Sequence, residues 1–355
     1  MGSLSEQVQI AIIGAGVIGR KHAKAIGESS SARLTAIVDP TASGHDLAEQ
    51  TGAHYFETIE ALLSSATRID GAIICTPNET HVPIATQIAS AGIHLLIEKP
   101  LSPRTTDGAT LLSHCATRKV KVCVGHHRRQ NPRILAAKHA LESAAIGDIV
   151  GCSGIWATLK TPDYFEGIGS WRRESTGGVV LINVIHEVDL LQHLVARIVR
   201  VYAEKAPSTR GYDAEEGVAL TFKFENGAVG TFLALDNASS PFTFEQATGE
   251  FTYHPYTGQN TYQILGRRGT LSLPQDELWT PKTDQGWKST LETTTVPWEE
   301  SDAFTRQLEN FVAVVKGTAQ PSCSGADGLA AVAVCEAIRQ SLEKNRPMQV
   351  DHYNR

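Results

Sequence analysis

The chain has 355 residues, of which 41% are hydrophobic and 20% charged, and its formal net charge is −6. This length allows two domains that each bury a core, and the acidic balance argues against nucleic acid as the main partner. The longest apolar runs are shorter than the roughly 18 residues that a membrane-spanning helix needs. We therefore expect a globular protein with no nucleic-acid or membrane partner.

The six cysteines form no Cys-x-x-Cys pair and no Cys/His pattern typical of a metal site. The first residues lack the basic and apolar segments of a secretory signal. We expect reduced thiols, no bound metal and a cytoplasmic location.

The first third of the chain alternates short apolar runs with amphipathic segments. This alternation predicts an α/β fold with a doubly wound parallel sheet, and we assign it to a first domain of residues 1–125. The expected strands are 8–13, 34–38, 71–75, 93–97 and 120–124, and the expected helices are 19–26, 42–51, 59–63, 81–91 and 105–118.

The pattern changes after Gly125 to one helix followed by a series of strand candidates. The Asn226-Gly227 pair indicates a hairpin, since these residues accept the positive φ angles of a tight turn. Consecutive strands joined in this way predict an α+β domain, residues 126–355, with an open-faced and largely antiparallel sheet. Its expected strands are 149–159, 198–204, 217–224, 228–235, 259–265 and 270–273, its expected helices are 131–143 and 179–195, and segment 238–258 is expected to be irregular.

Two helices, 302–316 and 326–344, are expected to close the chain, with Ser301 and Ser324 as their caps. We place them in the second domain and leave open that they pack back on the first. The alternating rows that begin at Val218 and Val229 predict an apolar sheet face that needs covering. A second subunit on that face gives a homodimer or homotetramer, and the closing helices are the alternative cover.

A glycine-rich turn, Gly14-Ala-Gly16-Val-Ile-Gly19, follows the first expected strand and opens the first helix. In a Rossmann domain the first glycine permits the tight turn, the second admits a pyrophosphate and the third allows close helix packing. The helix N-terminus adds free N–H groups for the phosphates. We therefore expect this turn, including Val17 and Ile18, to bind a dinucleotide.

Asp39 lies 20 positions after Gly19, at the end of the second expected strand. A carboxylate there accepts hydrogen bonds from a ribose diol and repels a 2′-phosphate, so we expect NAD, with NADP less favoured. An aspartate that only caps the following helix is the alternative.

Two later turns end neighbouring strands of the expected sheet. Thr76-Pro77-Asn78, followed by His81, ends one strand, and Glu98-Lys99-Pro100 ends the next. Ligands bind at the carboxyl ends of parallel strands, and the proline after Lys99 holds that lysine extended. A purely structural role is the alternative for the turn residues and His81. The residues that we expect to contact the cofactor here are Thr76, Asn78, His81, Glu98 and Lys99.

These motifs, with Gly177-Gly178 and the later His186-x-x-Asp189, resemble those of the glucose–fructose oxidoreductase/inositol dehydrogenase/MocA (Gfo/Idh/MocA) family. The resemblance covers essentially the whole chain. It implies an N-terminal Rossmann domain, a C-terminal domain with an open-faced mixed sheet, and an active site between them. It also implies nicotinamide-dependent oxidation of a sugar or cyclitol hydroxyl, or the reverse reduction, in which Lys99 takes part in proton transfer and substrate binding.

The sequence departs from the family pattern at one position. The family has an aspartate four residues before the histidine that His186 matches, and this chain has Ile182 there, with Asn183 beside it. Asn183 and His186 share a face of a helix, but an amide cannot take up a proton. Lys99 and His186 remain as the catalytic candidates. We favour His186 as the base and Lys99 as the group that polarises the substrate oxygen; the reverse assignment and a core role for His186 are the alternatives.

Further polar and aromatic residues are candidates for substrate binding. Guanidinium groups pair with carboxylates or phosphates, and aromatic rings are suited to stack on a sugar. Salt bridges with neighbouring acids and ordinary packing are the alternatives. The substrate-binding candidates are His127, Arg128, Tyr164, Trp171, Arg172 and Asn183, together with Lys99 and His186.

The motifs predict an NAD(P)-dependent oxidoreductase that transfers hydride between nicotinamide and a secondary hydroxyl or ketone of a sugar, cyclitol or related cyclic compound. A dehydrogenase or reductase of a hydroxy acid or a secondary-metabolite ketone is the second hypothesis. A catalytically silent regulator that senses NAD or a sugar is the third.

Overall fold

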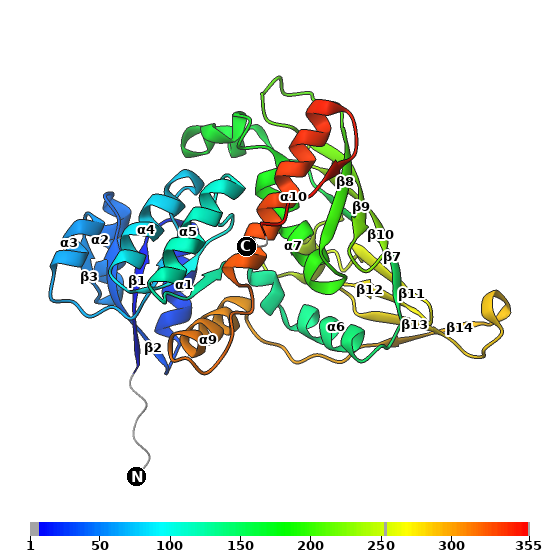
Figure 1. Ribbon diagram of the computed structural model, residues 1–355, viewed down its shortest axis with the longest axis horizontal. Helices are drawn as coiled ribbons and strands as arrows, with labels where there is room; N and C mark the ends of the chain where they lie inside the picture. Colours follow the sequence, from blue (N-terminus) through cyan, green and yellow to red (C-terminus); the bar gives the residue numbers. More distant parts are fainter. Residues whose placement is uncertain (1–6, 252–253, 354–355) are drawn as a thin grey trace, which may run out of the picture. The chain divides into compact units, whose positions relative to one another are not determined.

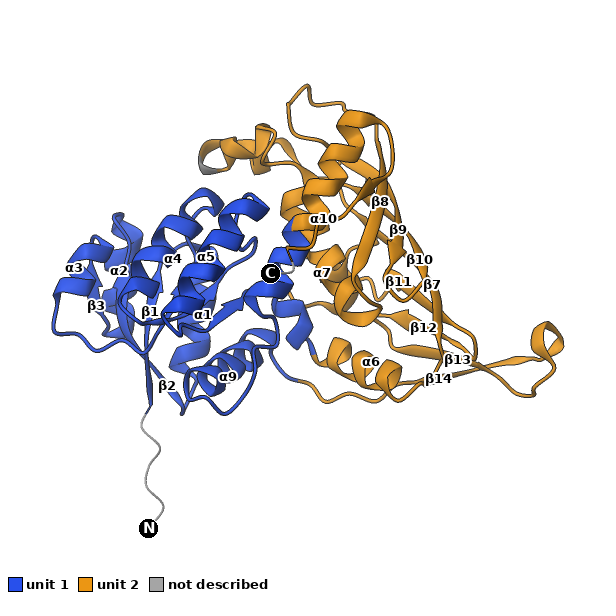
Figure 2. Cartoon of the chain, in the orientation of Figure 1, with its two compact units in different colours: residues 1–131, 301–332, 355 blue, residues 132–300, 333–354 orange. Residues whose placement is uncertain are grey.

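The computed structural model describes residues 7–251 and 254–353, which form two compact units (Figure 2). Unit 1 holds the residues up to Asn131 together with 301–332, and unit 2 holds 132–300 and the residues from Ala333 onward. The first break between the units falls after Asn131, and residues 301–332 are grouped with unit 1, the packing that was left open for the closing helices. The first six residues, which lack the pattern of a secretory signal, lie outside the described part.

Unit 1 is built on a six-stranded parallel sheet in the order β3-β2-β1-β4-β5-β6, of which β1, β2 and β3 are labelled in Figure 1. The order reverses between β1 and β4, so the loops after these two strands lie at a topological switch point. The strands are β1 (Val8–Ile13), β2 (Ala32–Val38), β3 (His54–Phe56), β4 (Gly71–Ile74), β5 (His94–Ile97) and β6 (Val122–Val124). The parallel doubly wound sheet is confirmed, and only the short β3 was not expected.

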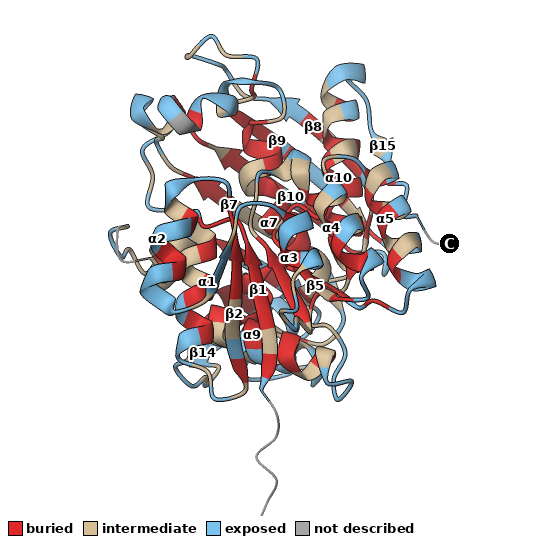
Figure 3. Ribbon diagram, turned by 90° about the vertical axis from the view of Figure 1, so that its left-hand side faces the viewer, coloured by how far each residue is buried: buried red, intermediate tan, exposed pale blue. Residues whose placement is uncertain are grey.

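Helices cover both faces of this sheet, whose strands are largely buried (Figure 3). Alternate strand residues point to opposite faces, so Ile12 packs in one apolar core with α1 and Ile13 packs in the other with α4 and α5. Phe304 and Phe311 of α9 belong to the first of these cores, which explains why residues 301–332 are part of unit 1. The helices are α1 (Val17–Gly27), α2 (Ala42–Thr51), α3 (Ile59–Ser64), α4 (His81–Ser90), α5 (Thr105–Thr117) and α9 (Ala303–Val315).

Unit 2 contains a nine-stranded mixed sheet in the order β14-β13-β12-β11-β7-β10-β9-β8-β15. Strands β7 and β10 pair in parallel, and the other neighbours are antiparallel. The largely antiparallel sheet is thus confirmed, while β13, β14 and β15 were not expected. The strands are β7 (Ile149–Ala157), β8 (Ile198–Lys205), β9 (Gly217–Phe224), β10 (Val229–Leu235), β11 (Tyr262–Gly266), β12 (Thr270–Leu273), β13 (Glu277–Pro281), β14 (Leu291–Thr295) and β15 (Met348–Gln349).

The remaining helices are α6 (Pro132–Glu142), α7 (Ile185–Leu194), α8 (Phe244–Thr248) and α10 (Gly325–Lys344). Helix α8 lies in the segment expected to be irregular, of which residues 252–253 are outside the described part. Asp302, rather than Ser301, caps α9 by accepting the N–H of Thr305 at 2.7 Å. Ser324 Oγ accepts the N–H of Asp327 at 3.2 Å, as a cap of the last helix should. Among the described helices, none combines the length and the apolarity needed to cross a membrane.

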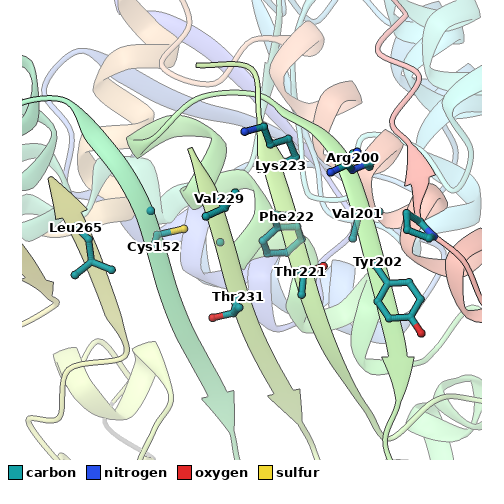
Figure 4. Close-up of a pocket in the computed structure, with 13 residues that line it drawn as sticks. Cys152, Arg200, Val201, Tyr202, Thr221, Phe222, Lys223, Val229, Thr231 and Leu265 are labelled. Atoms are coloured by element: carbon teal, nitrogen blue, oxygen red, sulfur yellow. The ribbon is translucent and has the colours of Figure 1, made fainter. Parts of the chain in front are cut away.

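Only one of the two alternating rows lies on the open face of the unit 2 sheet. The row that begins at Val218 and includes Phe222 is buried. The row that begins at Val229 shares the other face with Thr221, which pairs with Thr231. That face has a depression of about 410 Å³ that extends across β8, β9, β10, β7 and β11 (Figure 4). The open face therefore mixes polar and apolar side chains.

Candidate active site

The glycine turn of unit 1 is shaped by contacts that leave no room for side chains at two of its three glycines. Gly14 has a φ of +97°, and a Cβ there would lie 2.9 Å from the backbone of Cys75. A Cβ on Gly19 would lie 2.0 Å from the carbonyl oxygen of Gly14. At Gly16, by contrast, nothing lies within 4 Å of a Cβ position. Packing therefore requires Gly14 and Gly19, whereas the space beside Gly16 is open.

That open space lies at the N-terminus of α1, and its surroundings fit a dinucleotide. Gly16 provides no side-chain cap, so the first N–H groups of the helix have no capping oxygen from that residue. Val17, at the start of the helix, is 75% exposed although it is a large apolar residue. Free N–H groups at a helix N-terminus bind phosphate, and the absence of a Cβ at Gly16 admits it. This arrangement fits the pyrophosphate of NAD.

Asp39 fastens the glycine turn to the end of β2. Its Oδ2 accepts the N–H of Ala15 at 2.7 Å, and its Oδ1 accepts the N–H of Thr41 at 2.8 Å. Thr41 is the first residue before α2, so the carboxylate also organises the start of that helix. Oδ1 also accepts the hydroxyl hydrogen of Thr41 at 2.5 Å, so the acceptor capacity left for a ligand lies on Oδ2, which has a second lone pair. Asp39 therefore has a structural role and retains acceptor capacity at the turn.

His81 contacts the backbone of the loop that follows β4. The His81 ring nitrogens Nδ1 and Nε2 lie 2.8 Å from the carbonyl oxygens of Pro100 and Thr76, respectively. The residue is 1% exposed, and burial lowers the pKa of its imidazole, partly opposed by these two carbonyls. His81 thus joins the loops after β4 and β5, which is the structural role given as its alternative, and its contact with the cofactor stays a prediction. Asn78 is half-buried at the start of a short 3₁₀ helix.

Lys99 follows β5 directly, and the carboxylate of Glu98 lies beneath it. Glu98 Oε1 accepts a hydrogen bond from His22 Nε2 at 2.9 Å, and its Oε2 accepts the backbone N–H of Lys99 at 3.3 Å. Burial alone would raise the pKa of Glu98. The hydrogen bond and charge of His22, with the charges of His127 and Lys99, bring that pKa below its ordinary value. Glu98 is therefore a buried anion that fixes the backbone of Lys99.

His22 was not among the sequence candidates. It is fully buried on the inner face of α1, three residues after Gly19, and that spacing was the available signal. Its ring meets the ring of Phe304 edge-on, with centroids 5.3 Å apart. The ring of His127 stacks on the same Phe304 ring, with centroids 4.8 Å apart. His127 and His22 therefore flank one aromatic ring in the interior of unit 1.

The residues that follow β6 are more buried than a substrate-binding loop would suggest. A Cβ on Gly125 would lie 2.7 Å from the Glu98 carboxyl group, so this position requires glycine. Arg128 is 2% exposed. Arg129 donates to the carbonyl oxygen of Ser322 at 3.1 Å and pairs with Asp327 at 3.5 Å. For Arg129 the structure thus supports the salt-bridge alternative.

In unit 2, two glycines allow the segment before α7 to pack closely. A Cβ on Gly177 would lie 2.4 Å from the Cα of Arg172, and one on Gly178 would lie 2.2 Å from the carboxyl group of Glu215. Glu215 in turn accepts the N–H of Val180 at 2.8 Å. Burial raises the pKa of Glu215, although this hydrogen bond opposes the shift.

The predicted helix 179–195 begins with a π-helical turn, Val180–Val184, and continues as α7. Such turns are often found at functional sites because they shift side chains around the helix. Asn183 lies in this turn and its Oδ1 accepts a hydrogen bond from Lys160 Nζ at 2.8 Å. His186 follows in the first turn of α7 and is 9% exposed. Ile182 is half-buried and provides no polar group in place of an aspartate.

Lys160 is a candidate site residue that the sequence did not reveal. It follows β7, its side chain is 9% exposed, and it pairs with Asp236 at 3.2 Å. Burial lowers the pKa of Lys160 to about 8, against the opposing effect of Asp236. Its Nζ lies 4.7 Å from the centroid of the Tyr164 ring, and the guanidinium carbon of Arg172 lies 4.0 Å from the same centroid. Tyr164 and Arg172, both predicted for substrate binding, are thus brought together with Lys160.

Trp171 is 40% exposed, and its ring lies 5.5 Å from the guanidinium carbon of Arg172. Across residues 7–251 and 254–353, no group of three or more His, Cys, Asp or Glu side chains is placed to hold a metal ion. All six cysteines are free thiols.

Comparison with known proteins shows which family the chain belongs to. Residues 8–126 match GFO_IDH_MocA, described as an oxidoreductase family with an NAD-binding Rossmann fold, and residues 138–350 match its C-terminal alpha/beta domain. The chain belongs to the Gfo/Idh/MocA oxidoreductase family. It is accordingly an enzyme with an NAD-binding domain, and the resemblance inferred from its motifs is confirmed.

Similar members of the Gfo/Idh/MocA family match over nearly their whole length. An inositol 2-dehydrogenase from Rhizobium meliloti is 26% identical, covering 97% of this chain and 99% of that protein. The rhizopine catabolism protein MocA from Rhizobium meliloti is 24% identical, covering 95% and 96%. The crystal structure of the WlbA dehydrogenase from Bordetella pertussis, in complex with NADH and UDP-GlcNAcA, has a TM-score of 0.80 and 21% identity and covers 99% of both chains. This last likeness supports the fold.

Proposed function

We propose that the protein is an NAD-dependent dehydrogenase that oxidises a secondary hydroxyl of a sugar, a cyclitol or a related hydroxy compound, or reduces the corresponding ketone. The observation that carries this proposal is the position of Lys99, directly after β5 and fixed by the buried carboxylate of Glu98. The sheet edge formed by the carboxyl ends of β1 and β5 is where such folds bind ligands. The names of similar family members, inositol 2-dehydrogenase among them, support the substrate class.

NAD is the proposed cofactor, with NADP less favoured. The glycine turn, Val17 and Ile18 would hold the pyrophosphate, Asp39 would accept the ribose hydroxyls, and Thr76 and Asn78 would border the rest of the cofactor. Asp39 contacts the glycine turn, and its negative charge would repel a 2′-phosphate. When bound, oxidised nicotinamide supplies the hydride acceptor.

Lys99 and His186 are the proposed groups for proton transfer. His186 accepts the hydroxyl proton, because an imidazole exchanges protons near neutral pH. Lys99 donates a hydrogen bond to the same oxygen and stabilises its developing negative charge. The reverse assignment stays the alternative, and the lack of an aspartate at Ile182 leaves no third acid in this set.

The test is NADH formation, followed by absorbance, on a panel of polyols, sugars and hydroxy acids. Lys99→Met should lower turnover by at least about 100-fold while NADH binding, followed by fluorescence, stays within about twofold of wild type. Lys24→Met, an exposed change in the same unit, is the matched control. Absence of NADH formation from every compound would contradict the proposed substrate class, and full activity of Lys99→Met would remove the lysine from the mechanism.

A homodimer or homotetramer through the open face of the unit 2 sheet is part of the proposal. A depression lined by exposed Thr221, Val229 and Leu265 is the kind of surface that another copy can cover (Figure 4). Thr231→Glu should shift the mass measured by light scattering toward monomer, whereas Thr293→Glu on β14 should not. A concentration-independent wild-type monomer would contradict this part. The free thiols support a cytoplasmic location.

A further inference from the structure

Lys160 holds the side chain of Asn183 in one orientation. Its Nζ donates to Asn183 Oδ1 at 2.8 Å. An ammonium group has only donors, so the amide oxygen, and not the amide NH2, must face the lysine. The Nδ2 group therefore points away from Lys160, and within the described residues it has no hydrogen-bond partner. Two N–H donors are thus left for a ligand at the residue that follows Ile182, which occupies the position of the family's carboxylate.

Positive charge exceeds negative charge around this amide. Asp236 pairs with Lys160 at 3.2 Å, but it is shared with Arg210. Arg172 stacks on the Tyr164 ring that Lys160 also faces, and it donates to the Tyr164 carbonyl oxygen at 2.8 Å. In the described part of the chain, no carboxylate lies within ion-pair distance of Arg172. Lys160 and Arg172 therefore face the same Tyr164 ring. Within the described residues, the carboxylate that pairs with Lys160 is that of Asp236, which also pairs with Arg210.

A second buried carboxylate, that of Glu216, already has hydrogen-bond partners of its own. Glu216 accepts the N–H groups of Thr209 at 2.8 Å and Arg210 at 2.7 Å, and also the amide of Asn237 at 3.0 Å. These contacts lower the pKa of Glu216 although its burial opposes the shift. The negative charge of Glu216 is stabilised by the loop that carries Arg210, so it does not neutralise the positive charge of Lys160 or Arg172.

We propose that Lys160, Asn183 and Arg172 recognise a carboxylate of the substrate, so that the preferred substrate is a sugar acid or another hydroxy acid instead of a neutral polyol. The inference rests on the proposed redox function and narrows its substrate class. A carboxylate has only acceptors and is complementary to the amide donors of Asn183 and to a guanidinium group. Lys160 acts as a positioning residue, because it sets which end of the amide faces the ligand.

The absence of the family's aspartate also favours a substrate with a carboxylate. An aspartate at residue 182 or 183 would present acceptors and negative charge, which suit a hydroxyl and repel a carboxylate. Ile182 and Asn183 remove that charge, and Lys160 turns the remaining amide so that its donors are available. The departure from the family pattern is thus a change of specificity.

Binding is tested by calorimetry on the full-length protein saturated with NADH. The probes are matched pairs in which a carboxylate replaces a hydroxymethyl group: gluconate and glucitol, glucuronate and glucose, threonate and threitol. We expect at least one acid to bind roughly tenfold or more tightly than its neutral partner, as expected for hydrogen bonds to a charged group.

Three substitutions and a control locate the effect. Asn183→Asp should abolish the preference for the acid, since the new carboxylate pairs with Lys160, keeps the fold and repels an acidic ligand. Lys160→Met should also lose most of the preference, and Lys160→Arg should retain part of it. Lys288→Met, an exposed change in unit 2, should behave as wild type. NADH affinity and the midpoint of thermal unfolding report whether each variant is folded.

Each result has a distinct meaning. The carboxylate site is overturned if no acid binds the wild type, if acids and neutral partners bind equally, or if the preference survives in both Asn183→Asp and Lys160→Met. A wild type that binds an acid selectively but never exchanges hydride with it contradicts the proposed redox function and leaves the carboxylate site standing. Turnover of neutral polyols without a preference for acids would support the proposed redox function and contradict the carboxylate site.

Discussion

Glu98 and His22, which lie 76 positions apart in the chain, are joined by a 2.9 Å hydrogen bond in the interior of unit 1. The bond links the end of β5 to the inner face of α1, the helix that begins at the glycine turn. Through it, the residue next to Lys99 and the proposed cofactor helix share one buried contact. Perturbing this pair should therefore affect stability and activity together.

Glu98→Gln should lower the free energy of unfolding by about 1–3 kcal/mol at neutral pH, because it removes a charge-assisted buried hydrogen bond. The pKa of Glu98 is lowered in the folded state, so its contribution is present above the ordinary glutamate pKa and is lost as the pH falls. Urea unfolding should show the difference between wild type and Glu98→Gln staying constant above about pH 5 and shrinking as the pH falls below about 4.5. Glu49→Gln, on the exposed side of α2, is the control. A pH-independent difference would contradict the assignment of the buried anion.

Gly16→Ala and Gly19→Ala should have opposite consequences. The Gly16 Cβ position is open, so Gly16→Ala should fold with a stability within about 1 kcal/mol of wild type. It should weaken NAD binding roughly tenfold or more, because the methyl group fills the space proposed for the pyrophosphate. Gly19→Ala brings Cβ to 2.0 Å from Gly14 O and should destabilise the protein by about 1–3 kcal/mol or more. Calorimetric unfolding and NADH fluorescence titration separate the two effects; unchanged NAD affinity in Gly16→Ala would move the cofactor elsewhere.

Asp39→Asn should reduce the discrimination between NAD and NADP. The amide keeps an oxygen that can accept the N–H of Ala15, now made at 2.7 Å, but it removes the charge that repels a 2′-phosphate. The ratio of kcat/KM for NAD to that for NADP should fall by about tenfold or more, which corresponds to about 1.4 kcal/mol. Asp46→Asn, an exposed change on α2, is the matched control. An unchanged ratio would assign Asp39 a structural role alone.

The affinity for an acidic ligand should fall above about pH 8, where Lys160 loses its proton. The lowered pKa of this lysine comes first from burial; Asp236 opposes the shift, and Arg210 and Arg172 add to it. Below that pH the ammonium form both attracts a carboxylate and orients Asn183. Lys160→Arg, which stays charged, should bind the acid with little change between about pH 7 and pH 9.5. A decline of equal size in both proteins would mean that another group titrates.

The sequence alone determined those features that depend on local spacing. The glycine turn between β1 and α1, the alternation of strands and helices, and the place of Lys99 after a buried strand are written in neighbouring residues, so motif and periodicity were enough to predict them. The same spacing identified the family and singled out His186 and Asn183 on one helix.

Tertiary structure decided which distant side chains meet. The pairing of His22 with Glu98, the buried lysine at Asn183 and the packing of α9 against the first sheet join residues from separate parts of the chain. A π-helical turn, rather than a regular helix, carries Asn183. No periodicity encodes these contacts, because burial, charge pairing and the orientation of an amide are set by what folds against a residue and not by its neighbours in sequence.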